Sequence, residues 1–250
     1  MSTHPFTITT SWDDGHRLDQ RVADLLDRHG LRGTFYIARD FLPERLSDAE
    51  IRDLAGRHEI GAHTLTHPVL TEISLDQAEQ EISGSKNWLE DLTGVPSNAF
   101  CYPKGANNPA LQTIVQQAGY KMARGVEQYH LQADGIRFAR YNLPTTIHIY
   151  PFPLRPVSGL KKMKLRLEPL QRILPHMREL GISPLALRNW SSLAIALLGR
   201  AAAVGGVWHL WGHSWEIERY QMWDELEVVL AAAGRYTDAR HVTNNELVLA

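Results

Sequence analysis

Residues 6–15, FTITTSWDDG, combine a β-rich run with two aspartates and a glycine. Apolar residues at helical spacing follow within 17–29, and Gly30 marks the expected end of that helix. A second β-rich run, 33–38, comes next. Strands that alternate with helices through short connections predict a parallel sheet with helices outside it.

The same alternation continues along the rest of the chain. Further strands are expected at 58–64, 99–103, 120–124 and 207–211, with a last one at 241–249. Helices are expected at 47–57, 74–92, 109–118, 161–203 and 216–233, and 142–160 is predicted to be a long loop with a short strand. An open sheet and a closed barrel both fit this pattern. Because α/β barrels commonly use about 250 residues as one domain, we interpret 1–250 as a single domain.

Composition excludes several classes of protein. The chain has 250 residues, 26 Lys+Arg against 28 Asp+Glu, and a formal net charge of -2, which provides no global attraction for nucleic acid. One cysteine, Cys101, excludes an intrachain disulfide and a cysteine-based zinc finger. The first residues lack the pattern of a secretory signal, and Arg200 interrupts the longest apolar stretch, 193–210. A cytoplasmic location is therefore expected.

Acidic residues and histidines follow three of the predicted strands. They are Asp13 and Asp14 after the first strand, His63 and His67 after the third, and His209 and His213 at the end of the late strand. The carboxyl ends of parallel strands meet at one rim of a sheet, where α/β folds place their ligand sites. We therefore expect these side chains to converge.

The residue types at this rim predict a metal site. His63 and His67 are four residues apart, which in a helical turn places both imidazoles on one side. Imidazole nitrogens suit Zn²⁺, and a carboxylate from Asp13 or Asp14 completes a set of three ligands with one position open for water. The other aspartate can then accept a proton from that water. Zn²⁺ is the expected ion, although Co²⁺, Ni²⁺ and Mn²⁺ also fit such ligands.

No single motif carries this hypothesis. His-x-x-x-His alone is a weak signal, and Asp-Asp-Gly after a strand is often only a turn. The sequence contains neither a glycine-rich nucleotide-binding loop nor a serine nucleophile elbow. Separate segments that place matching residue types at one rim are the basis of the predicted metal site.

Four short motifs occur in order along the chain. They are SWDDG at 11–15, HTLTH at 63–67, YPKG at 102–105 and GHSWE at 212–216. Together they resemble the polysaccharide deacetylase family, which is carbohydrate esterase family 4 and includes the NodB homology domain. The resemblance covers at least residues 6–125. It implies a distorted (β/α) barrel with seven strands and metal-dependent removal of an N-acetyl group from an amino sugar or glycoconjugate.

The resemblance also implies roles for individual residues. Asp13 corresponds to the general base, Asp14, His63 and His67 to the metal ligands, the backbone near Tyr102 to part of the oxyanion site, and His213 to the general acid, with His209 as the second candidate.

The sequence departs from the family pattern at two motifs. Cys101 stands where the third motif usually has an arginine that holds the base aspartate, and Arg124 is a candidate replacement or else a surface ion-pair residue. The usual Asp-x-x-Asp-Trp motif is not visible, so Glu216 is a candidate for orienting His213. Trp215 is either a wall of the substrate site or a core residue.

Residues 155–172 carry six basic residues and one acidic residue. The simpler interpretation is a solvated helix face, and the alternative is a basic lid that meets an anionic or lipid-linked sugar at a membrane surface. Two other functions fit the same motifs: hydrolysis of a non-sugar amide, and metal-free recognition of a sugar.

Overall fold

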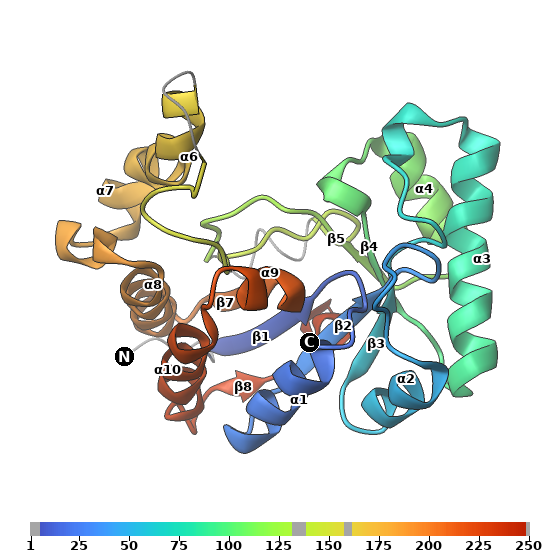
Figure 1. The fold of residues 1–250 in the computed structure, drawn as a ribbon, viewed down its shortest axis with the longest axis horizontal. Coiled ribbons are helices and arrows are strands. Elements are labelled where there is room, and N and C mark those ends of the chain that lie inside the picture. The colour runs from blue at the N-terminus through green and yellow to red at the C-terminus, as the bar shows by residue number, and fades with distance from the viewer. Residues whose placement is uncertain (1–5, 132–138, 158–161, 249–250) are drawn as a thin grey trace.

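The fold is built on a curved parallel sheet. The computed structural model describes residues 6–131, 139–157 and 162–248. Seven strands follow the spatial order β5-β4-β3-β2-β1-β7-β6, and β8 pairs with the first residues of β1. The strands are β1 (Thr7–Trp12), β2 (Gly33–Ile37), β3 (Glu59–Ala62), β4 (Ala99–Cys101), β5 (Met122–Arg124), β6 (Ile147–His148), β7 (Val207–Gly212) and β8 (Arg240–His241). The predicted seven-stranded (β/α) barrel is thus confirmed as a half-barrel of parallel strands (Figure 1).

Most of the helices lie around the outside of this half-barrel (Figure 1). The helices of the described residues are α1 (Asp19–Arg28), α2 (Asp48–Ala55), α3 (Leu75–Thr93), α4 (Pro109–Gln117), α6 (Met163–Ile173), α7 (Met177–Leu180), α8 (Trp190–Val204), α9 (Ser214–Arg219), α10 (Trp223–Gly234) and α11 (Asn244–Val248). Figure 1 shows α6 and α7 standing away from the sheet, in the connection between β6 and β7. Among the described residues, no helix combines the length and apolarity that crossing a membrane requires.

An extended segment, 143–148, joins the two edges of the half-barrel. Its first residue, Leu143, forms a parallel bridge with Arg124 at the end of β5. Its last two residues form β6 and pair with β7. The segment therefore brings Arg124 and β7 into the same interior.

The sheet has a core on each face. Outside, apolar side chains of the strands and helices form the larger cluster. Inside, the smaller cluster includes Tyr36, Cys101 and Met122 and lies among buried polar groups. The half-barrel interior therefore has to satisfy hydrogen bonds as well as bury apolar surface.

The predicted helix 216–233 is two helices, and this prediction was wrong. Gln221 adopts a φ of 53°, and the N–H of Met222 donates to the carbonyl of Ile217 at 2.9 Å. This is the six-residue bond of a Schellman helix end, which is usually made with glycine at the left-handed position. Because glutamine occupies that position here, the sequence pattern did not indicate the break.

The prediction of a last strand over 241–249 was also wrong within the described residues. The strand ends at His241, and helix α11 (Asn244–Val248) follows. The Thr243 N–H donates to the Glu246 side chain at 2.8 Å, and Thr243 with Glu246 three residues later has the spacing of a capping box. That spacing was the available signal for a helix.

Asn244 is expected to be a strong stability determinant. Its side chain is fully buried, donates to the Tyr36 hydroxyl at 2.9 Å and accepts from the Thr9 hydroxyl at 2.9 Å. Asn244→Ala leaves both hydroxyls short of a partner and should lower the free energy of unfolding by about 2–3 kcal/mol. Urea unfolding followed by circular dichroism measures this. The matched control is Asn245→Ala, which should cost under about 0.5 kcal/mol because that side chain is partly exposed; equal losses would contradict the assignment.

Candidate metal and catalytic site

The turn after β1 presents two carboxylates at the rim. The Asp13 N–H donates to the carbonyl of Gly212, the last residue of β7, at 3.0 Å. Asp14 has a φ of 81° and Gly15 a φ of 71°. A Cβ on Gly15 would lie 2.6 Å from Ile37, so this tight turn requires glycine. The geometry directs the two aspartates into different surroundings.

His63 and His67 converge, but not through the helical turn that was expected. Thr64 and His67 have φ values of 68° and 59°, so the segment is a loop. The His67 N–H donates to the Thr64 hydroxyl at 3.0 Å and closes the loop locally. This geometry places the Nε2 atoms of the two histidines 3.1 Å apart.

Asp14 completes a set of three donor atoms. Its Oδ1 lies 3.6 Å from His63 Nε2 and 3.5 Å from His67 Nε2. Ligands in tetrahedral array around an ion at about 2.0–2.1 Å are about 3.3–3.4 Å apart, which matches these separations. Asp14 Oδ1 is buried and has no hydrogen-bond partner within the described part of the chain. The donor set therefore fits a divalent transition-metal ion.

The protonation of the three ligands also suits an ion. Burial lowers the pKa of His63 and of His67 to about 4, so both imidazoles are neutral at pH 7. His63 Nδ1 donates to the Cys101 carbonyl at 2.8 Å, which leaves the lone pair on Nε2. The His67 ring stacks on Phe41 with centroids 4.0 Å apart. Neutral, fixed imidazoles are the ligating form.

Trp215 orients the third ligand. Its indole N–H donates to Asp14 Oδ2 at 2.8 Å, and the side chain lines the site cavity. The bond holds one carboxylate oxygen and leaves Oδ1 directed at the histidines. Of the two interpretations of Trp215, the structure supports a wall of the site.

Two further groups of three donors lie close together. They are Asp13, His63 and Cys101, and His148, His213 and Glu216. In the first, Asp13 is paired with Arg124 and burial raises the pKa of the Cys101 thiol. In the second, Glu216 already holds His213 at 2.6 Å. The Asp14 group is the one with an unpartnered carboxylate oxygen.

Arg124 is the partner of Asp13. It is fully buried, and its Nη2 contacts both Asp13 oxygens. The guanidinium lies 5.3 Å from the Tyr36 ring centroid and 4.7 Å from that of Trp211. Burial alone would raise the pKa of Asp13, but the charge of Arg124 lowers it to about 2. Of the two interpretations of Arg124, the structure thus excludes a surface ion pair.

His213 belongs to a hydrogen-bonded pair at the end of β7. Its Nδ1 lies 2.6 Å from Glu216 Oε2, and its Nε2 lies 3.9 Å from Asp14 Oδ2. Burial would lower the pKa of His213, but the bond to Glu216 and the charges of Asp14 and Asp13 raise it to about 9. His213 therefore carries a proton at neutral pH and Glu216 orients it.

Sequence reasoning missed His148. Its Nε2 lies 3.3 Å from Glu216 Oε2, and its ring stacks on Trp211 with centroids 4.0 Å apart. It lines the same cavity as His213. The available signal was a polar residue between two isoleucines in the short strand that the loop 142–160 was expected to contain.

Of Tyr102 and His209, only Tyr102 lines the site cavity. Tyr102 lines the cavity, and its hydroxyl donates to the Tyr141 carbonyl at 2.9 Å. The Tyr102 N–H donates to the Arg124 carbonyl at 3.3 Å, so an oxyanion would have to compete for it. His209 is buried in the interior with Nε2 2.8 Å from the Ser11 hydroxyl, and it does not line the cavity. The geometry thus favours His213 over His209 as the acid.

The two aspartates of the β1 turn and four of the histidines open into one cavity of about 370 Å³; the four are His63, His67, His148 and His213. Its lining consists of the two aspartates and the site histidines together with Phe41, Tyr102, Lys104, Val126, Gln128, Arg155, Arg172, Trp211 and Trp215. Aromatic rings and cations thus surround the metal donors.

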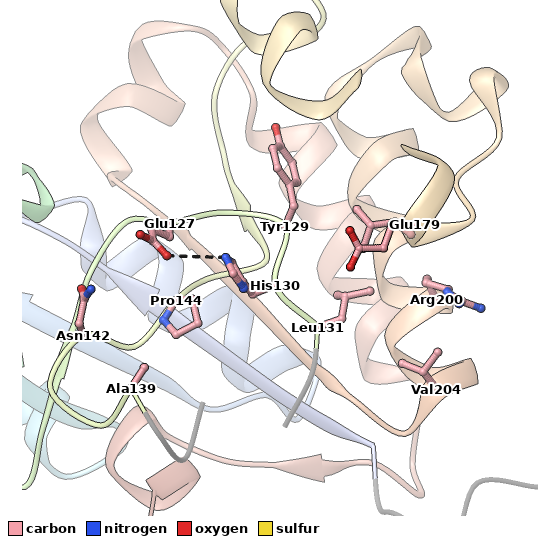
Figure 2. A pocket seen from close by; sticks show the side chains of 11 residues that line it. Glu127, Tyr129, His130, Leu131, Ala139, Asn142, Pro144, Glu179, Arg200 and Val204 are labelled. Atoms are coloured by element: carbon pink, nitrogen blue, oxygen red, sulfur yellow. Dashed lines mark ion pairs between the residues drawn. The ribbon is translucent and has the colours of Figure 1, made fainter. Parts of the chain in front are cut away.

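A second cavity of about 470 Å³ lies elsewhere (Figure 2). The figure shows Glu127 paired with His130 on one side of it, and Glu179 and Arg200 on another. The Glu127–His130 pair is separated by 3.7 Å. None of the acidic residues or histidines expected at the strand ends lines it. The smaller cavity is therefore the candidate site.

Comparison with known families matches residues 1–123 to a family described as polysaccharide deacetylase. Residues 1–123 belong to the polysaccharide deacetylase family. This polysaccharide deacetylase segment contains Asp13, the Asp14 metal group and Tyr102, and it ends one residue before Arg124. The predicted family resemblance is confirmed.

Curated relatives of this deacetylase segment include two enzymes of peptidoglycan. Peptidoglycan-N-acetylmuramic acid deacetylase PdaA of Bacillus subtilis is 26% identical over 123 residues, which is 48% of this chain and 46% of the relative. Peptidoglycan-N-acetylglucosamine deacetylase PgdA of Listeria monocytogenes is 28% identical over 103 residues, which is 40% of this chain and 22% of the relative. The chain spans about half or less of the length of the curated relatives it matches.

Solved structures share the fold beyond the matched segment. A Mycobacterium smegmatis protein assigned to the polysaccharide deacetylases superposes with a TM-score of 0.67 at 16% identity, over 100% of this chain and 93% of that one. The deacetylase PplD of Streptococcus pyogenes, solved with acetate, gives 0.51 at 19% identity, over 64% and 69%. The half-barrel is thus a NodB-like deacetylase fold.

Proposed function

We propose that this protein is a zinc-dependent hydrolase that removes an N-acetyl group from an amino sugar or glycoconjugate. The observation that carries the proposal is the buried Asp14 oxygen, which has no hydrogen-bond partner among the described residues and faces two neutral imidazoles, with Asp13 and His213 lining the same cavity. The family match and the names of the relatives support the reaction type.

Asp14, His63 and His67 would hold the ion. When bound, Zn²⁺ supplies a Lewis acid for the amide carbonyl and for the attacking water. The hydrogen bonds from His63 to the Cys101 carbonyl and from Trp215 to Asp14 fix the ligands before the ion arrives.

Asp13 acts as the base in this proposal. It is ionised at neutral pH because Arg124 holds its pKa at about 2, so it is always able to accept. It takes one proton from water while the oxygen bonds to the carbonyl carbon. Because the pKa of Asp13 is low, Asp13 then passes this proton on and returns to its ionised form.

His213 acts as the acid. Its raised pKa keeps a proton on Nε2, and Glu216 fixes the ring. That proton passes to the amine nitrogen as the carbon–nitrogen bond breaks, which yields acetate and the free amine. The surroundings thus lower the pKa of the base and raise that of the acid. With this difference, one site can accept one proton and donate another at pH 7.

Metal binding should depend on the Asp14 group alone. Chelator-treated protein titrated with Zn²⁺ in a calorimeter should bind one equivalent tightly, and His67→Ala should weaken that binding by more than about a hundredfold because one of three protein ligands is lost. His148→Gln is the matched control, since His148 belongs to the other histidine group.

The control separates the two groups. Retained affinity in His148→Gln with loss in His67→Ala supports the proposed ligands. The reverse pattern would place the ion at His148, His213 and Glu216 and would overturn the mechanism.

A further inference from the structure

Three cations line the site cavity without a role in the proposed chemistry. Lys104 comes from the turn after β4, Arg155 from the connection after β6, and Arg172 from α6. All three line the 370 Å³ cavity that contains the metal group. Three separate segments therefore bring positive charge to one cavity.

One carboxylate offsets part of this charge. Glu168 pairs with Arg155 at 2.9 Å and also with Arg172. Two arginines that share one glutamate keep one net positive charge, and Lys104 adds another. An anion bound in the cavity would be attracted by this remaining positive charge.

Arg155 is held in place rather than free in solvent. Its backbone N–H donates to the Arg166 carbonyl at 2.8 Å, and its guanidinium lies 5.1 Å from the Tyr150 ring centroid. Its Nε is buried and has no hydrogen-bond partner among the residues that the structure describes. The burial of Nε adds to this fixation, and a fixed guanidinium that lines the cavity is suited to an oxyanion.

We propose that Lys104, Arg155 and Arg172 bind an anionic group of the substrate, either a carboxylate or a phosphate, so that the substrate class is an acidic N-acetylated sugar. This inference rests on the proposed function. The chain segment 155–172, expected to be a solvated helix face or a basic lid, thereby contributes two of its basic side chains to the site.

The size of the cavity places the anion close to the acetamide. A volume of about 370 Å³ is near the lower end of the range of about 300–1,000 Å³ typical of small-molecule sites. The anion therefore belongs to the sugar unit that carries the acetyl group or to its immediate neighbour.

Binding of sugars without an amide tests this inference independently of turnover. The zinc-loaded protein is titrated calorimetrically with glucose 1-phosphate, glucuronate and glucose. At least one of the two anions should bind tenfold or more tightly than glucose, and added salt should weaken that preference. A preference for the phosphate indicates a phosphosugar, and a preference for glucuronate indicates a carboxylate sugar.

Variants test whether the preference for anions depends on the proposed cations. Arg172→Gln should reduce it at least fivefold, Arg172→Lys should retain part of it, and Lys104→Gln should reduce it further when combined with Arg172→Gln. Lys164→Gln is the matched control, an exposed cation on the same helix that does not line the cavity.

The inference is overturned if glucose binds as well as both anions, if nothing binds, or if the preference survives Lys104→Gln with Arg172→Gln. A preserved anion preference without acetate release from any acetylated sugar would instead overturn only the proposed deacetylation.

Discussion

Asp13→Asn is expected to lower the turnover of an N-acetylated amino sugar by about a hundredfold to ten-thousandfold, the range of a positioned general base. The amide has the shape of the carboxylate but cannot accept the proton from the attacking water. Zinc affinity should change less than about threefold, because Asp13 is not one of the three proposed ligands. Acetate release and zinc calorimetry on the same preparation measure both effects.

Asp19→Asn is the matched control for this substitution. Asp19 is also fully buried, burial raises its pKa well above the usual range, and its side chain does not line the site cavity. The same change there should alter turnover less than about threefold. Equal losses in the two variants would indicate a general effect of substituting buried aspartates, and loss of zinc in Asp13→Asn would contradict the division of roles between Asp13 and Asp14.

Arg124→Met should lower the free energy of unfolding by about 3–5 kcal/mol, because it leaves a buried ionised carboxylate without its partner. The fully buried Arg124 contacts both oxygens of Asp13, and the methionine retains only the apolar stem. Chemical unfolding followed by tryptophan fluorescence gives the loss.

The double variant Asp13→Asn with Arg124→Met distinguishes this ion pair from simple packing. Removing both charges should cost at least about 2 kcal/mol less than the sum of the two single changes, since neither charge is then stranded. Additive losses would show that Arg124 stabilises the interior by its volume alone.

Local signals in the sequence predicted most of the fold. Ser47 with Glu50 and Ser74 with Gln77 form capping boxes at the starts of α2 and α3, and a serine followed three residues later by Glu or Gln is a local pattern that predicts a helix start. The alternation of strands and helices up to Arg124 could also be predicted from residues that are near one another in the sequence. The failures lie near the end of the chain, where a left-handed Gln221 replaces the usual glycine.

The part of the site that could be predicted consists of residues directly after the carboxyl ends of strands. Asp14, His63 and His67 converge because their strands are parallel neighbours, although a loop with two left-handed residues replaces the expected helical turn. Sequence spacing does not reveal that Arg124, at the end of β5, is buried in the interior of the half-barrel. It also does not reveal that an extended segment carries His148 across to Glu216, because that contact depends on strand pairing far apart in the chain.

Acetate release tests the central claim most directly. The protein, chelator-treated and then reloaded with Zn²⁺, is incubated with N-acetylmuramic acid, N-acetylglucosamine 1-phosphate and short N-acetylglucosamine oligomers. We expect release of acetate and free amine from at least one of them, absent without metal and in His67→Ala and reduced at least a hundredfold in Asp13→Asn. Release that persists in the chelated protein or in His67→Ala, or no release of acetate from any of the substrates by a zinc-loaded protein, would contradict the proposed function.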